Sequence, residues 1–185
     1  MTEKVCWEIC KECNGKRETC CTLGVPVTIE DIKVIESQGY KLDDFAVAGE
    51  WDEDEIDGNE EWWKKNLITV DGKHFKIHLR EKENSHCFFL KDKEGCTLGD
   101  KRPALCKLYP FWVDDEKNEI EYDDPEEKFC HFHGKDIPLE EGMKLFGETE
   151  ESIRSHFSKI KEDCDNNHEK HKEIILRLIK EDKIQ

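Results

Sequence analysis

Residues 10–21, CKECNGKRETCC, hold four cysteines, and Cys6 lies just upstream. So many thiols in one short stretch point to disulfides, redox chemistry or metal ligation. The adjacent pair Cys20 and Cys21 helps to choose among metals. Neighbouring side chains of an extended backbone point in opposite directions, so this pair does not easily bind one tetrahedral ion. It suits two neighbouring sites or a multi-iron cluster, for which thiolates are the usual ligands.

A second thiol-rich block contains Cys87, Cys96, Cys106 and Cys130. Sixty-five residues separate it from Cys21, far more than the dozen or so that separate the two halves of a single zinc module. Only tertiary folding can therefore join the two blocks. We expect a bound metal to hold the N-terminal loop against the second block, and the metal-free protein to fold poorly.

The motifs CKEC and CC, then CFFL, CTLGDKRPALCKLYPF and a cysteine before HFHG, resemble the CxxCxxCC family of zinc- or iron-chelating proteins from about residue 6 to 147. The resemblance implies that eight thiols are the metal ligands: Cys10, Cys13, Cys20, Cys21, Cys87, Cys96, Cys106 and Cys130. They allow two sites of four thiolates, or one cluster with several free thiols. Cys164 falls outside the signature and is interpreted as an incidental thiol.

The sequence departs from the family pattern at NGKRET, which widens the gap before the Cys-Cys pair to six residues. The ligand register therefore stays open, and Cys6 can replace one of the assigned thiols. Three histidines beside cysteines, His86, His131 and His133, are alternative ligands or donors to a ligand. Arg102 is a candidate cofactor-binding residue, because its N–H donors can offset the negative charge of a thiolate-bound cluster. The competing interpretation of Arg102 is an ion pair with a carboxylate.

Three functions follow from these thiols. The favoured one is an iron–sulfur protein, of the four-iron (4Fe–4S) type, that serves electron transfer or cluster-dependent maturation within a larger assembly. The first alternative is a structural zinc protein that acts as a protein-interaction module. The second is a cluster-dependent methylase or oxidoreductase, since a flagellin-lysine methylase branch carries a similar cysteine signature. No Gly-rich methyl-donor motif or acid–base set accompanies the thiols here.

The composition narrows the class of partner and the compartment. The formal net charge of −16 argues against nucleic acid as a partner, because phosphate binding needs clustered Lys and Arg. It suits an acidic surface that docks on a basic patch of another protein. No apolar run approaches the roughly 18 residues of a spanning helix, so no membrane insertion is expected. Without an apolar segment typical of a secretion signal, we expect a cytoplasmic protein, where disulfides are rare outside hyperthermophiles.

The thiols must be positioned by short helices and hairpins, and the sequence pattern therefore predicts an α+β fold. We expect a small irregular Cys-rich core, held together by metal, followed by a C-terminal helical segment. We expect a metal-binding domain at 1–147 and a C-terminal helical segment at 148–185. Thr28 and Asp31 predict the start of a helix, and Asp71-Gly72 predicts a β-hairpin. A helix is expected near 138–146.

Three further stretches carry local predictions. The acidic run at 50–66 contains three tryptophans that are expected to cover an apolar surface. His74 and His78 share one strand face with Lys76. The two histidines lie roughly 13 Å apart, so they cannot share an ion, and they are interpreted as solvent-facing. From about 149 to 183 the pattern is helical, with a polar bend or exposed stretch around 161–171.

Overall fold

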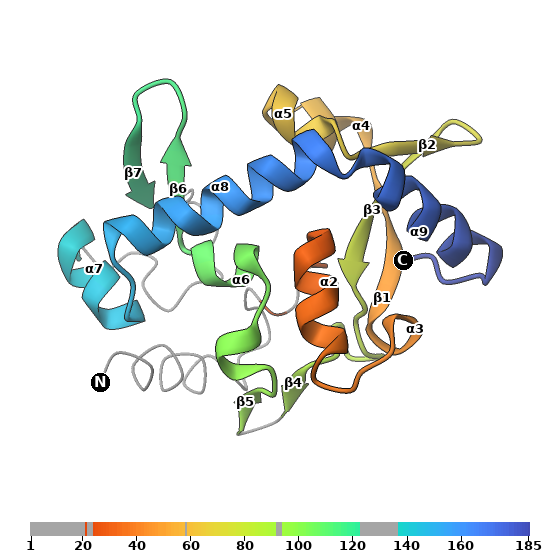
Figure 1. The fold of residues 1–185 in the computed structure, drawn as a ribbon, viewed down its shortest axis with the longest axis horizontal. Coiled ribbons are helices and arrows are strands. Elements are labelled where there is room, and N and C mark those ends of the chain that lie inside the picture. The colour runs from red at the N-terminus through yellow and green to blue at the C-terminus, as the bar shows by residue number, and fades with distance from the viewer. Residues whose placement is uncertain (1–20, 22–23, 58, 92–93, 123–136) are drawn as a thin grey trace.

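The computed structural model describes residues 21, 24–57, 59–91, 94–122 and 137–185 (Figure 1). Helices and short antiparallel strands both occur, which confirms the α+β class. Three ranges form the main sheet: β1 (Ala46–Trp51), β2 (Ile68–Val70) and β3 (Lys73–Leu79). The strand order is β1-β3-β2, and both pairings are antiparallel.

The β2–β3 hairpin turns at Asp71 and Gly72, as predicted. Their φ angles are 50° and 81°, and two positive values are what the type I′ turn of a tight hairpin requires. Two further segments extend the sheet. Residues 25–27 lie along β3, where the Val27 N–H donates to the Ile77 carbonyl at 3.0 Å. Residues 183–185 lie along β1, where the Ala48 N–H donates to the Lys183 carbonyl at 2.9 Å.

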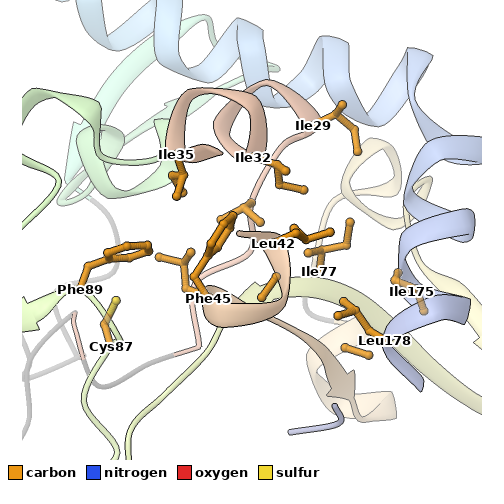
Figure 2. Close-up of a cluster of buried hydrophobic side chains, with 14 of the residues drawn as sticks. Ile29, Ile32, Ile35, Leu42, Phe45, Ile77, Cys87, Phe89, Ile175 and Leu178 are labelled. Atoms are coloured by element: carbon orange, nitrogen blue, oxygen red, sulfur yellow. The ribbon is translucent and has the colours of Figure 1, made fainter. Parts of the chain in front are cut away.

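One hydrophobic core lies between this sheet and three helices, α2 (Ile29–Glu36), α3 (Leu42–Phe45) and α9 (His168–Lys180). The predicted capping box starts α2, since Thr28 Oγ1 accepts from the Asp31 N–H and Asp31 Oδ2 accepts from the Thr28 N–H, both at 3.0 Å. Figure 2 shows the isoleucines of α2 facing β3 and α9, with Cys87 at one side of the cluster.

A second core gathers tryptophans. It involves α5 (Glu61–Lys64), α6 (Ala104–Leu108), α8 (Glu150–Asn166) and the hairpin β6 (Phe111–Asp114)–β7 (Glu119–Tyr122). The long helix α8 runs beside α6 and α5 (Figure 1). The predicted aromatic cover at 50–66 is confirmed, because Trp62 and Trp63 on α5 are both buried in this core.

The remaining elements are short, apart from one helix. The acidic α4 (Glu53–Asp57) precedes α5, and a small ladder of β4 (Leu90–Lys91) and β5 (Gly95–Cys96) leads into the 3-10 turn η2 (Gly99–Lys101). Helix α7 (Leu139–Phe146) confirms the helix expected near 138–146. In the described parts of the chain no helix is long and apolar enough to cross a membrane.

His78 is not solvent-facing, which corrects the sequence-based interpretation of this residue, whereas His74 is half-exposed and bonds to the exposed Thr69 hydroxyl at 3.0 Å. Lys76 is only 4% exposed, and His78 accepts a hydrogen bond from Trp51 Nε1 at its Nε2, at 2.8 Å. The His78 ring also lies against the Gly49 backbone, where an added Cβ would come within 2.3 Å of Nδ1. Burial, with a smaller contribution from the Lys76 charge, lowers the pKa of His78 to about 3. The polar face of β3 is therefore covered at Lys76 and His78.

The polar stretch between the last two helices is also more buried than expected. The bend is confirmed, since α8 and α9 meet at Asn167. However, Asp163, Cys164 and His171 are all buried. They point to an internal polar network, described below, rather than to an exposed loop.

Candidate metal centre

Backbone pairing holds the end of the N-terminal thiol block against the second block. The Cys87 N–H donates to the Cys21 carbonyl at 2.7 Å, and Cys87 also bridges to Glu81, just after β3. Residues 25–27 continue from Cys21 into the ladder with β3. Two cysteines that are 66 positions apart in sequence are thus neighbours in the fold.

The other two described thiols of the signature come from short, well-anchored elements. Cys96 ends β5 and is paired with Leu90 of β4. Cys106 lies on α6, whose first N–H, that of Ala104, donates to Asp31 Oδ1 at 3.0 Å. Asp31 therefore caps α2 with one carboxylate oxygen and holds α6 with the other. This double role fixes the helix of Cys106 relative to the first core.

The four thiols of Cys21, Cys87, Cys96 and Cys106 line one cavity of about 510 Å³. Cys87 is buried and the other three are half-buried. The remaining predicted ligands, Cys10, Cys13, Cys20 and Cys130, lie outside the described residues, as do Cys6, His131 and His133. Among the described residues, no group of three or more Cys, His, Asp or Glu side chains is positioned to hold a metal ion.

The cavity disfavours thiolates unless a positive charge joins them. Burial is the largest cause of a raised pKa at all three of the thiols of the second block that the structure describes. It raises the pKa of Cys87 to about 12 and that of Cys96 to about 11. The pKa of Cys106 is also raised well above its ordinary value, by burial first and then by the neighbouring thiols. A bound metal would supply the missing positive charge, because it deprotonates a coordinating thiol.

Arg102 also lines the cavity. Its positive charge lowers the pKa values of Cys96 and Cys106, opposing the larger effect of burial. Burial opposes the lowered pKa of Glu148, which results chiefly from hydrogen bonds with His156 and Ser152 and to a smaller extent from the Arg102 charge. The Arg102 Nε–H donates to the Gly99 carbonyl at 3.2 Å. Arg102 therefore acts electrostatically on both the thiols and a carboxylate, and its role in cofactor binding stays a prediction.

Sequence reasoning did not anticipate that tryptophans share the cavity with the thiols. Trp51, Trp63 and Trp112 line it together with Asn59 and Glu60. Glu60 orients this wall, since its two carboxylate oxygens accept from the Nε1–H groups of Trp62 and Trp112. The three tryptophans in the acidic run were a visible signal of a covered surface, but they did not indicate which surface.

Two further residues from the sequence analysis do not line this cavity. Cys164 is buried in α8 and lines a different, much smaller cavity, in keeping with its place outside the signature. His86 is bonded to the Asn84 side chain at 3.1 Å.

Comparison with known protein families gave one match. A family model named CxxCxxCC, described as a putative zinc- or iron-chelating domain, matches residues 9–131. Comparisons with curated proteins and with solved structures gave no match. The matched range includes all eight predicted ligands and Arg102.

Proposed function

Because the chain belongs to the CxxCxxCC family of zinc- or iron-chelating domains, we propose that it is an iron–sulfur protein with a cluster of the four-iron type. Cys21, Cys87, Cys96 and Cys106 would hold the cluster, with ligands also drawn from Cys10, Cys13, Cys20 and Cys130. When bound, such a cluster supplies one-electron chemistry. The role that follows is electron transfer or cluster-dependent maturation within a larger assembly.

The shared cavity is the observation that carries this proposal. Four thiols from three separate parts of the chain line one cavity of about 510 Å³. A single tetrahedral zinc ion has Zn–S distances of about 2.3 Å and would fill only a small part of that space. Four thiolates suit both zinc and iron–sulfur clusters, so the size of the cavity is what favours the cluster. The adjacent cysteines Cys20 and Cys21 favour the same group.

This chain's own residues then have defined tasks. The buried side chains around Cys87 limit the access of water to its sulfur atom, and solvent exposure of the sulfur atoms is one factor that sets a reduction potential. Arg102 places a positive charge near Cys96 and Cys106. Asp31 keeps the helix of Cys106 against α2. None of these tasks requires an acid–base catalyst.

We propose that the partner is a protein with a basic surface. The exposed residues of α4, Glu53, Asp54, Glu55 and Asp57, form an acidic segment. Asn59 and Glu60, which line the cavity, follow it directly in sequence. Opposite charges speed association in a salt-dependent manner. Binding to the partner should therefore weaken with added salt, and reversal of these four charges should slow association.

Metal analysis after anaerobic purification tests the metal assignment. We expect a brown protein with iron and acid-labile sulfide. Cys106→Ser should lose most of both, whereas Cys164→Ser, which changes a buried thiol outside the cavity, should keep them. A colourless protein with stoichiometric zinc and no iron would overturn the cluster and establish the zinc alternative. Equal losses in the two variants would contradict the assignment of the ligands to the cavity.

A further inference from the structure

The four described tryptophans differ in what their indole N–H groups bind. Trp51 Nε1 donates to His78, and the Nε1 groups of Trp62 and Trp112 both donate to Glu60. Trp63 is 6% exposed, and its Nε1 has no partner among the described parts of the chain. A buried donor without a partner costs about 1–3 kcal/mol, so this exception needs a physical cause.

Two other buried polar atoms share this condition. Asn66 Oδ1 and His171 Nδ1 have no hydrogen-bond partner in the described residues either. The other polar atom of each side chain does have a partner. Asn66 Nδ2 donates to Asp163 Oδ2 at 3.3 Å, and His171 Nε2 lies 2.6 Å from the same oxygen. The two side chains are therefore fixed, and their unpaired atoms are not the result of free rotation.

All three side chains line one small cavity of about 20 Å³, together with Lys76 and Asp163. A cavity of about 10–15 Å³ in this measure is enough for one water molecule, provided that two to four polar partners surround it. This cavity meets both conditions. It adjoins the cavity of the thiols, since Pro26, Trp63 and Leu105 line both.

The balance of donors and acceptors identifies the ligand. Trp63 Nε1–H offers a donor, and Asn66 Oδ1 offers an acceptor. Because an ionised Asp163 carboxylate can only accept, the proton between it and His171 is assigned to Nε2, and in that neutral tautomer Nδ1 is an acceptor. A metal cation would face the indole N–H and the Lys76 ammonium group. An anion would face the Asp163 carboxylate and the amide oxygen of Asn66.

We propose that this cavity is a binding site for one water molecule, which accepts a hydrogen bond from Trp63 and donates to Asn66 and His171. The water joins α5 and the turn after it to α9, and so completes the polar network around Asp163.

Nuclear magnetic resonance of the full-length, metal-loaded protein tests this site. In water-selected NOE and ROE spectra, we expect the Trp63 Hε1 proton to show a cross-peak to water with the sign of a long-lived bound molecule. The Hε1 protons of Trp51, Trp62 and Trp112 are internal controls, because protein atoms accept their hydrogen bonds. They should show no such cross-peak.

A crystal structure that resolves ordered water gives a second test that needs no variant. We expect one solvent peak within about 3.2 Å of Trp63 Nε1, Asn66 Oδ1 and His171 Nδ1. If Trp63 Hε1 behaves like the three controls, or if Trp63 Nε1 instead meets a protein acceptor, the site does not exist. Because the test does not depend on which metal is bound, its outcome is independent of the iron–sulfur proposal.

Discussion

Lys76 should titrate well below an ordinary lysine. Its side chain is 4% exposed, and burial lowers its pKa from 10.5 to about 8, although Cys164 and Asp163 act in the opposite direction. Its ammonium group donates to the Trp63 carbonyl at 2.5 Å and lies 3.9 Å from the centre of the Trp63 ring. These contacts hold the charged form in place without abolishing the cost of burying it.

The sign and size of the effect on stability follow from these values. Between about pH 8 and 10.5 the unfolded lysine keeps its proton while the folded one loses it. The unfolded state then binds more protons, so stability rises with pH across this window and is flat below it. One pKa unit corresponds to about 1.4 kcal/mol, so the shift of the Lys76 pKa from 10.5 to about 8 changes the free energy of unfolding by about 3 kcal/mol across the whole window.

The assay compares wild type with Lys76→Met by urea denaturation at several pH values and equal metal loading. Removal of the lysine also leaves the Trp63 carbonyl without its donor, but that cost does not vary with pH. The diagnostic quantity is therefore the change with pH in the difference between the two free energies of unfolding. We expect wild type to gain about 3 kcal/mol relative to the variant between pH 7.5 and 10.5. Lys73→Met, which removes an exposed lysine from the same strand, is the matched control.

A direct titration can refute the argument. The ¹³Cε signal of Lys76, assigned by its absence in Lys76→Met, should have a midpoint near 8. A midpoint at or above about 10, together with a constant stability difference, would show that the indole rings and the carbonyl compensate fully for burial.

Three further predictions concern the elements around the thiols. Asp31→Ala removes the acceptor shared by α2 and α6 and should cost about 1–3 kcal/mol in urea denaturation, with reduced metal content; unchanged metal content would mean that α6 is held by other contacts. Gly49→Ala places a Cβ within 2.3 Å of the His78 ring and should lower the free energy of unfolding by about 1–3 kcal/mol. The Trp51 indole resonance should shift as well, and a wild-type melting temperature would contradict the close packing. Deletion of residues 183–185 uncovers β1 and should speed amide exchange at Ala48 and Glu50 while promoting association; wild-type exchange rates would show that the tail does not protect this edge.

Local signals in the sequence predicted local structure well. The Asp71-Gly72 turn and the Thr28–Asp31 capping box each depend on a few neighbouring residues, and both appear as expected. The burial of Lys76 could not be predicted in this way. Alternation along β3 shows that its two faces differ, but not that tryptophans from another segment cover the polar face.

The site was predictable as a set of residue types rather than as an arrangement. The spacing of Cys21 and Cys87 implied that they must meet, and the backbone hydrogen bond between them shows how. The link from Asp31 to the helix of Cys106 spans 73 positions, and no periodicity signals such a contact. The tryptophan wall depends in the same way on contacts between distant segments. The ligand assignment itself stays a prediction.

The cavity of the thiols adjoins both hydrophobic cores. Cys21, Cys87 and Cys96 pack with the core of the sheet, whereas Cys106 lies on α6, whose Ala104 and Leu108 belong to the tryptophan core. A centre that binds all four thiols is therefore an internal cross-link between two separately packed halves. The hydrogen bond from the Ala104 N–H to Asp31 already joins the same two cores, so a bound metal would add a further link between them, made through sulfur atoms.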